Sequence, residues 1–180
     1  MNEFLTDLTD KHTTHSYIPI YEHLFSKIRE TCTGILEIGV QTGGSMKLWN
    51  GYFPNAIVYG IDSDIYQNRY REFAPRVRLI QADAYTRECA STFSDESLDV
   101  VIDDGPHTLS SMCDVLTLYY RTIKPGGYLI IEDVQDINWI HEIKQCADPV
   151  AKWTVIDRRS IKGRYDDILI TVQKPFSQGS

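Results

Sequence analysis

Short apolar runs alternate along the chain with longer segments that have helical periodicity. Five runs have the length and the β-branched content of buried strands, namely residues 34–39, 56–61, 77–82, 98–103 and 127–132. Helical patterns lie before, between and after them, at residues 18–30, 45–53, 64–73, 85–93, 110–123 and 137–147. This alternation predicts an α/β fold in which helices cover both faces of a parallel sheet.

Two further apolar runs, residues 152–157 and 167–172, complete a predicted sheet of seven strands. The connection between them, residues 158–166, is too short for a crossover helix, so this pair is expected to be an antiparallel hairpin. The sequence KPGG at 124–127 is expected to end the fifth helix. With 180 residues, we expect one domain, in which residues 1–32 form an N-terminal segment and helix and residues 33–174 form the core.

Composition and charge narrow the functional classes. The formal net charge is −7, and no basic run exceeds the two arginines of DRR at 157–159, which argues against nucleic acid as a partner. The four cysteines lie far apart in the sequence, which argues against a zinc site or a disulfide framework. Because no apolar stretch resembles a leader or a membrane span, we expect a cytoplasmic protein without a membrane partner.

The first strand runs into a glycine-rich turn, LEIGVQTGGS at 36–45. Glu37 lies within the strand, and Gly39 and Gly43 lie in the turn that opens the next helix, where glycine lets the backbone approach a ligand closely. The spacing differs from G-x-G-x-x-G, the pattern that binds a pyrophosphate. A nucleoside ligand without phosphate fits this turn better.

Acidic residues follow the next two strands. Asp62 ends the second strand, where a carboxylate can accept hydrogen bonds from ribose hydroxyls, and Asp83 follows the third strand, within reach of an adenine edge. Each of these residues alone is typical of an ordinary turn. Together with the glycine-rich turn, they form a pattern that resembles the class I methyltransferases, which bind S-adenosylmethionine on a Rossmann-like fold with this seven-stranded sheet. The resemblance implies a cofactor cleft formed by Glu37, Gly39, Gly43, Ser45, Asp62, Asp83, Ala84 and Asp103.

Two neighbouring strands end in acidic residues. VIDDGPH at 101–107 contains Asp104, and YLIIEDVQD at 128–136 contains Glu132 and Asp133. Since neighbouring parallel strands present their carboxyl ends to one crevice, these three carboxylates should meet and repel one another unless a cation compensates. Oxygen ligands of this kind favour Mg²⁺. His107 alone is more simply a solvated residue, but beside this cluster it is a candidate general base.

A narrower resemblance rests on VIDDGPHTLSSM (101–112), IKPGGYLIIEDV (123–134) and the N-terminal TDKHTTHSYIPIYEHLF (9–25). These motifs resemble the magnesium-dependent sugar O-methyltransferases that act on macrolide and rhamnosyl natural products, a family grouped with cephalosporin hydroxylase-type proteins. The resemblance implies that Asp104, Glu132 and Asp133 hold Mg²⁺ and that His107 acts as the base.

The chain departs from that family at two positions of the motifs. Pro106 stands where members often carry serine, and Asp83 and Ala84 stand where members carry an Asp-Gln pair. Pro106 would stiffen its loop without removing a ligand, and Ala84 would lose one side-chain contact with the adenine. Macrolide-modifying members also have a large additional N-terminal domain, so their substrate and assembly are not transferred to this chain.

The sequence thus predicts a metal-dependent O-methyltransferase that acts on a hydroxyl of a sugar or a glycosylated small molecule. A catechol-type O-methyltransferase and a non-catalytic protein that binds S-adenosylmethionine are the alternatives. Tyr17, Trp139 and Tyr165 lie near the expected cleft, where each is more simply explained by packing. The oligomeric state stays open, although a homodimer would give a small, open cleft additional walls.

Overall fold

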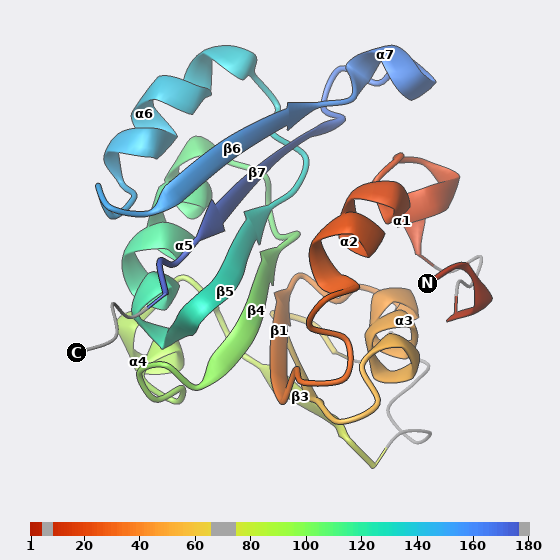
Figure 1. Ribbon diagram of the computed structural model, residues 1–180. Helices are drawn as coiled ribbons and strands as arrows, with labels where there is room; N and C mark the ends of the chain where they lie inside the picture. Colours follow the sequence, from red (N-terminus) through yellow and green to blue (C-terminus); the bar gives the residue numbers. More distant parts are fainter. Residues whose placement is uncertain (5–8, 66–74, 177–180) are drawn as a thin grey trace.

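A computed structural model describes residues 1–4, 9–65 and 75–176. They form a seven-stranded sheet in the order β3-β2-β1-β4-β5-β7-β6 (Figure 1). The strands are β1 (Gly34–Ile38), β2 (Ile57–Asp62), β3 (Val77–Gln81), β4 (Leu98–Asp103), β5 (Ile123–Ile131), β6 (Lys152–Asp157) and β7 (Ile168–Gln173). β1 to β5 are parallel to one another, and β7 pairs antiparallel with both β5 and β6. The predicted fold class is therefore confirmed.

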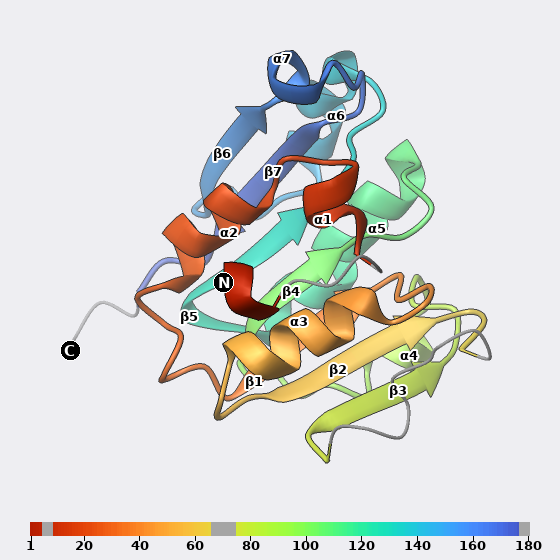
Figure 2. The same cartoon turned by 90° about the vertical axis from the view of Figure 1, so that its right-hand side faces the viewer.

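Helices flank the sheet on both faces, as Figure 2 shows. Those on one face are α1 (Asp10–Thr13), α2 (Ile18–Phe25) and α3 (Gly44–Tyr52), and those on the other are α4 (Arg87–Ala90), α5 (Leu109–Tyr119) and α6 (Ile140–Gln145). Three single turns, η1 (Asn2–Phe4), η2 (Tyr120–Thr122) and η3 (Ile137–Trp139), extend the helical regions. The helix expected at 64–73 falls largely outside the described residues. β6 and β7 are joined by one unexpected helical turn, α7 (Arg159–Lys162), which is short enough to leave the hairpin antiparallel.

The prediction that KPGG ends the fifth helix is wrong. These four residues lie inside β5, which begins four residues earlier than expected, at Ile123. The register with β4 shifts between Leu98 and Val100, and Gly126 adopts a positive φ of 82°. Gly126 and Gly127 instead exchange backbone hydrogen bonds with Lys174, at 2.9 and 3.0 Å. The glycines thus accommodate a bulge in a continuous strand.

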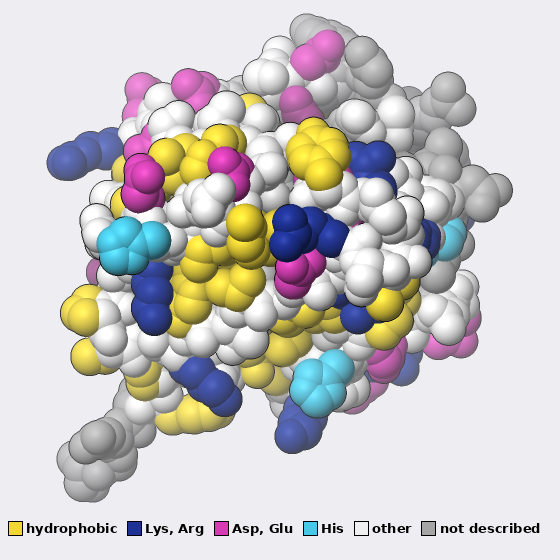
Figure 3. Space-filling model, turned by 90° about the horizontal axis from the view of Figure 1, so that it is seen from above, with side chains coloured by type: hydrophobic (Ala, Val, Ile, Leu, Met, Phe, Trp, Pro, Cys, Tyr) yellow, Lys and Arg dark blue, Asp and Glu magenta, His cyan; other side chains and the backbone are white. Residues whose placement is uncertain are grey.

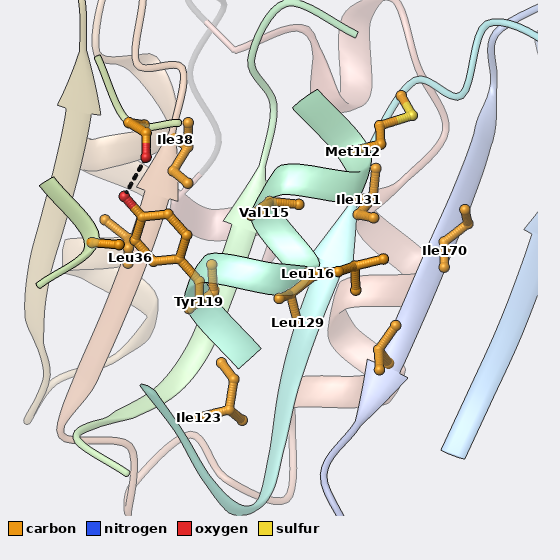
Figure 4. Packing of buried hydrophobic residues seen from close by; sticks show 14 of the residues in the cluster. Leu36, Ile38, Met112, Val115, Leu116, Tyr119, Ile123, Leu129, Ile131 and Ile170 are labelled. Atoms are coloured by element: carbon orange, nitrogen blue, oxygen red, sulfur yellow. Dashed lines mark hydrogen bonds between the residues drawn. The ribbon is translucent and has the colours of Figure 1, made fainter. Parts of the chain in front are cut away.

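Two apolar clusters hold the layers together. α5 places Met112, Val115, Leu116 and Tyr119 against the sheet, and the Tyr119 hydroxyl donates to the Ala84 backbone oxygen at 2.8 Å (Figure 4). On the opposite face, aromatic residues of α2 and α3 pack around Trp49, which is fully buried. These clusters fix the sheet from both sides and so fix the positions of the strand ends that carry the site.

Candidate functional site

The carboxyl ends of the parallel strands meet at one edge of the sheet, next to a cavity of about 570 Å³. The volume lies within the range of small-molecule sites. Its walls come from the loops after β1, β2, β3 and β4 and from the N-terminal residues Thr9, Asp10 and Lys11. On the face seen in Figure 3, the described acidic, basic and histidine side chains are interspersed with hydrophobic ones and form no continuous basic surface.

Asp62 organises the turn after β1. Its Oδ2 accepts hydrogen bonds from the backbone N–H groups of Val40 and Gln41, each at 2.8 Å, and Oδ1 accepts one from Asp64 at 3.0 Å. Partial burial alone would raise the pKa of Asp62, but these hydrogen bonds outweigh it and lower the pKa. The carboxylate is therefore ionised at neutral pH and holds the glycine-rich turn against β2.

Gly39 joins this turn to the acidic loop after β4. It has a φ of 86°, and a β-carbon at this position would lie 2.0 Å from the backbone oxygen of Asp104. The Asp104 N–H donates to the Ile38 carbonyl at 2.8 Å, so the two loops run in direct contact. Only glycine permits this approach, which places the predicted cofactor turn and the predicted metal loop side by side.

Most of the predicted cofactor residues line the cavity. These are Gly39, Ser45, Asp62, Asp83 and Ala84. Gly43 caps the start of α3 with a φ of 85°, directly before the lining residues Gly44 and Ser45. Asp83 accepts the backbone N–H of Tyr85 at 2.9 Å, which fixes the loop after β3. The arrangement gathers the predicted cofactor residues from three loops into one cavity.

Glu37 and Asp103, which were also predicted to form the cofactor cleft, are buried and are not among the lining residues of the cavity. Burial raises the pKa of Asp103 to about 7, although its carboxylate accepts a hydrogen bond from the Tyr85 hydroxyl at 2.5 Å. Glu37 is fully buried, and its Oε2 accepts the indole N–H of Trp49 at 3.2 Å. Each acid bonds to a residue that lines the cavity, Asp103 to Tyr85 and Glu37 to Ser45.

Lys11 is the main residue that the sequence prediction missed. Its side chain is fully buried, and its Nζ lies 3.0 Å from Glu37 Oε1, 2.8 Å from Asp104 Oδ2 and 2.8 Å from Glu132 Oε1. Burial alone would lower the pKa of Lys11, but attraction to Asp104, Glu132 and Glu37 raises it well above its usual value. The ammonium is therefore charged and joins the strand ends of β1, β4 and β5.

Two tyrosines of the same N-terminal region also reach the acids. The Tyr17 hydroxyl donates to Asp133 Oδ1, and the Tyr21 hydroxyl donates to Glu132 Oε1. Both side chains are completely buried. Tyr17 was expected to be a packing residue, but it also bonds to a predicted metal ligand. The TDK motif with its following histidine and tyrosine was the available signal for these contacts.

Asp104, His107 and Asp133 form the outer part of the cluster, with one ligand atom from each within 4.8 Å of the others. His107 Nε2 lies 3.9 Å from Asp104 Oδ1 and 3.8 Å from Asp133 Oδ2. His107 and Asp133 both have positive φ angles, 53° and 52°, a strained conformation that is typical of functional sites. A capping box between Thr108 and Ser111 starts α5 immediately after His107 and fixes that turn.

The protonation properties of Asp133, Glu132 and His107 suit a site that binds a cation. Burial and the nearby Asp104 raise the pKa of Asp133 to about 8, and burial with neighbouring acids raises that of Glu132 well above its usual range. Burial lowers the pKa of His107, so its imidazole is neutral at pH 7 and able to accept a proton. Hard oxygen donors crowded together fit a divalent cation such as Mg²⁺, which would stabilise their ionised forms.

Comparison with known proteins identifies the family. Residues 36–134 match the profile of the family described as Methyltransferase domain. The chain belongs to this methyltransferase family. The match runs from β1 to the residue after Asp133 and so includes every strand end described above.

Curated relatives add detail to this assignment. An 8-demethyl-8-α-L-rhamnosyl tetracenomycin-C 2′-O-methyltransferase of Streptomyces olivaceus is 34% identical over 73% of this chain and 36% of its own length. A mycinamicin VI 2″-O-methyltransferase of Micromonospora griseorubida is 28% identical over 75% of the chain and 37% of its own length. The chain thus spans little more than a third of the length of these relatives.

A solved structure supports the fold. MycE methyltransferase from the mycinamycin biosynthetic pathway, in complex with Mg and SAH, superposes with a TM-score of 0.69 and 22% identity. The match covers 90% of this chain and 50% of MycE.

Within the described residues, none of the helices is long and apolar enough to span a membrane.

Proposed function

We propose that this methyltransferase domain transfers a methyl group from S-adenosylmethionine to a hydroxyl oxygen, with Mg²⁺ as a cofactor. The observation that carries the proposal is the direct contact between the two predicted parts of the site. Gly39 of the glycine-rich turn packs on Asp104 of the acidic loop, and both loops line one cavity together with His107. A donor in the turn and an acceptor at the acids would therefore be neighbours.

The cofactor would bind in the cavity between the loops after β1, β2 and β3. Asp62 would accept hydrogen bonds from the ribose hydroxyls, and the loop of Asp83 and Ala84, which also lines the cavity, would contact the adenine. Ser45 hydrogen-bonds Glu37, so the start of α3 is held to β1 beneath the cofactor. Because Ala84 has a small, apolar side chain, its contribution to adenine binding would come from packing.

Asp104, Glu132 and Asp133 are the proposed ligands of the metal. The Oδ2 of Asp104 and the Oε1 of Glu132 are bound by Lys11, so these residues would reach the metal through their other carboxylate oxygens. The Tyr17 hydroxyl orients Asp133 by its hydrogen bond to Oδ1. A bound Mg²⁺ would lower the pKa of the acceptor hydroxyl and hold it in position.

The chemical step is an in-line displacement at the methyl carbon. A lone pair of the acceptor oxygen forms the new C–O bond, and the C–S bond breaks with its electron pair remaining on sulfur. The hydroxyl proton passes to Nε2 of His107, which is neutral at pH 7 and is 28% exposed beside the cavity. Alignment of the two substrates in the cavity would supply much of the rate enhancement.

A sugar hydroxyl is the proposed acceptor. The proposal is supported by the rhamnosyl and mycinamicin O-methyltransferases to which the chain is similar. A catechol, whose adjacent hydroxyls also chelate Mg²⁺, is the alternative acceptor. A protein that binds S-adenosylmethionine without turnover is the non-enzymatic alternative, which the set of acids and His107 does not favour.

A methyl-transfer assay tests the proposal. Purified protein would be incubated with labelled S-adenosylmethionine and either an alkyl L-rhamnoside or a catechol, with Mg²⁺ or with EDTA. We expect methylation of the rhamnoside that EDTA abolishes and Mg²⁺ restores. The Asp104→Asn variant should be inactive, and Asp114→Asn, which changes an exposed acid of α5, should be unaffected. Transfer that is insensitive to EDTA, or binding of the cofactor without transfer to either acceptor, would contradict the proposal.

A further inference from the structure

Three carboxylates surround the Lys11 ammonium. Nζ donates hydrogen bonds to Asp104 Oδ2 and Glu132 Oε1, each at 2.8 Å, and lies 3.0 Å from Glu37 Oε1 as an ion pair. Mg²⁺ requires oxygen ligands at about 2.0–2.1 Å. With Lys11 in place, the oxygens around this point thus lie at the distances of an ammonium and would have to move closer to bind the metal.

The same acids can nevertheless form a metal site. One oxygen each from Glu37, Asp104 and Glu132 lies within 4.8 Å of the others, and Asp104 also belongs to the outer group with His107 and Asp133. Asp104 directs Oδ2 towards Lys11 and Oδ1 towards His107. Its carboxylate therefore bridges an inner position, which holds the ammonium, and an outer position beside Asp133. Because Glu132 Oε1 is bound by Lys11, Glu132 would reach an ion in the outer position only through Oε2.

Lys11 is held in the inner position because several contacts fasten the N-terminal segment to the core. Ser16 donates through its hydroxyl to Asp167 at 2.9 Å and accepts from Arg158 at 2.8 Å. Tyr17 bonds to Asp133, and Lys162 donates to the backbone oxygen of Thr13 at 3.1 Å. Withdrawal of Lys11 from the acids would require these contacts to break as well.

We propose that the Lys11 ammonium is a permanent cation of the site, which fills the inner position between Glu37, Asp104 and Glu132 and confines the divalent metal to the outer position. Lys11 thereby replaces the second metal ion of what would otherwise be a two-ion carboxylate site. It is a positioning residue, because it acts on the metal ligands and not on the substrate. The inference rests on the proposed metal-dependent function.

Titration with Mn²⁺, followed by calorimetry and by electron paramagnetic resonance of the free ion, measures how many ions bind. We expect one ion for the wild type and two for Lys11→Met, since the methionine removes the charge and leaves a side chain of similar length. Lys162→Met is the matched control, because Lys162 contacts the same segment through backbone oxygens of His12 and Thr13. This control should bind one ion, and the spin–spin coupling of two nearby Mn²⁺ ions should appear only in Lys11→Met.

A folded Lys11→Met variant that binds one ion or none would overturn the inference. If that variant does not fold, wild-type crystals soaked in Mn²⁺ decide the question by anomalous scattering. The inference requires a peak in the outer position with Lys11 still bonded to Glu37 and Glu132, and a peak at the site of the ammonium contradicts it. A wild type that binds no ion at all would refute the proposed metal dependence itself.

Discussion

Lys11 Nζ lies 2.8 Å from Glu132 Oε1, although 121 residues separate the two along the chain. This ion pair connects α1 to the residue that follows β5, and both side chains are almost inaccessible to solvent. The N-terminal segment is thus part of the site, and its lysine compensates acids that would otherwise repel one another. Stability and metal binding should therefore depend on the same contact.

Replacement of Lys11 by methionine should destabilise the metal-free protein. Removal of one partner from a buried ion pair leaves the other charges uncompensated and typically costs about 3–5 kcal/mol. Urea unfolding followed by circular dichroism, with EDTA present, measures the loss. Lys162→Met, which removes an exposed lysine and leaves no buried charge uncompensated, should cost clearly less than Lys11→Met. Equal losses in the two variants would show that Lys11 is not the counter-ion of the buried acids.

His107→Gln should lower kcat by about 100-fold to 10,000-fold, the usual contribution of a general base. Because the proposed mechanism assigns proton transfer to His107 and metal binding to the carboxylates of Asp104, Glu132 and Asp133, the acids should hold the metal without the imidazole. Steady-state kinetics and Mn²⁺ titration of the same preparation separate the two roles. A tenfold or greater loss of metal affinity would identify His107 as a ligand instead.

Asp62 should make stability depend on pH. Its pKa in the folded protein lies below the unfolded value of about 3.9, so its ionised form stabilises the fold. This contribution is complete above about pH 4 and is lost as the pH falls through the lower, folded pKa. The difference in unfolding free energy between the wild type and Asp62→Asn should therefore shrink from pH 7 to pH 3.

Urea titrations at several pH values measure that difference. Asp114→Asn, in which an exposed acid of α5 is changed, provides the control and should show no comparable trend. A difference for Asp62→Asn that is independent of pH would mean that the hydrogen bonds to Val40 and Gln41 do not favour the ionised carboxylate.

The fold was predictable because hydrophobic periodicity and connection length determine most of it. Residues 158–166 leave no room for a crossover, and β6 and β7 indeed form an antiparallel hairpin. The KPGG segment was misinterpreted because its glycines and proline are typical of a helix end. Its backbone instead bonds to Lys174, a long-range contact that no local pattern reveals.

The candidate site was predictable where it depends on strand ends. Asp104 and Asp133 meet because β4 and β5 are neighbours in the sheet. The contacts of Lys11, Tyr17 and Tyr21 depend on how the N-terminal segment packs across the ends of the strands, which periodicity does not determine. A lysine in a short polar segment ordinarily indicates an exposed side chain, so its burial emerges only from the folded structure.

Calorimetric titration of Mg²⁺ into the protein saturated with S-adenosylhomocysteine tests the central claim most directly. We expect saturable binding to the wild type and to Asp114→Asn, and loss of that binding in Asp104→Asn. This result would support the proposal that the acids at the ends of β4 and β5 hold a metal beside the cofactor. A wild type that binds S-adenosylhomocysteine but no divalent ion would contradict the metal-dependent mechanism.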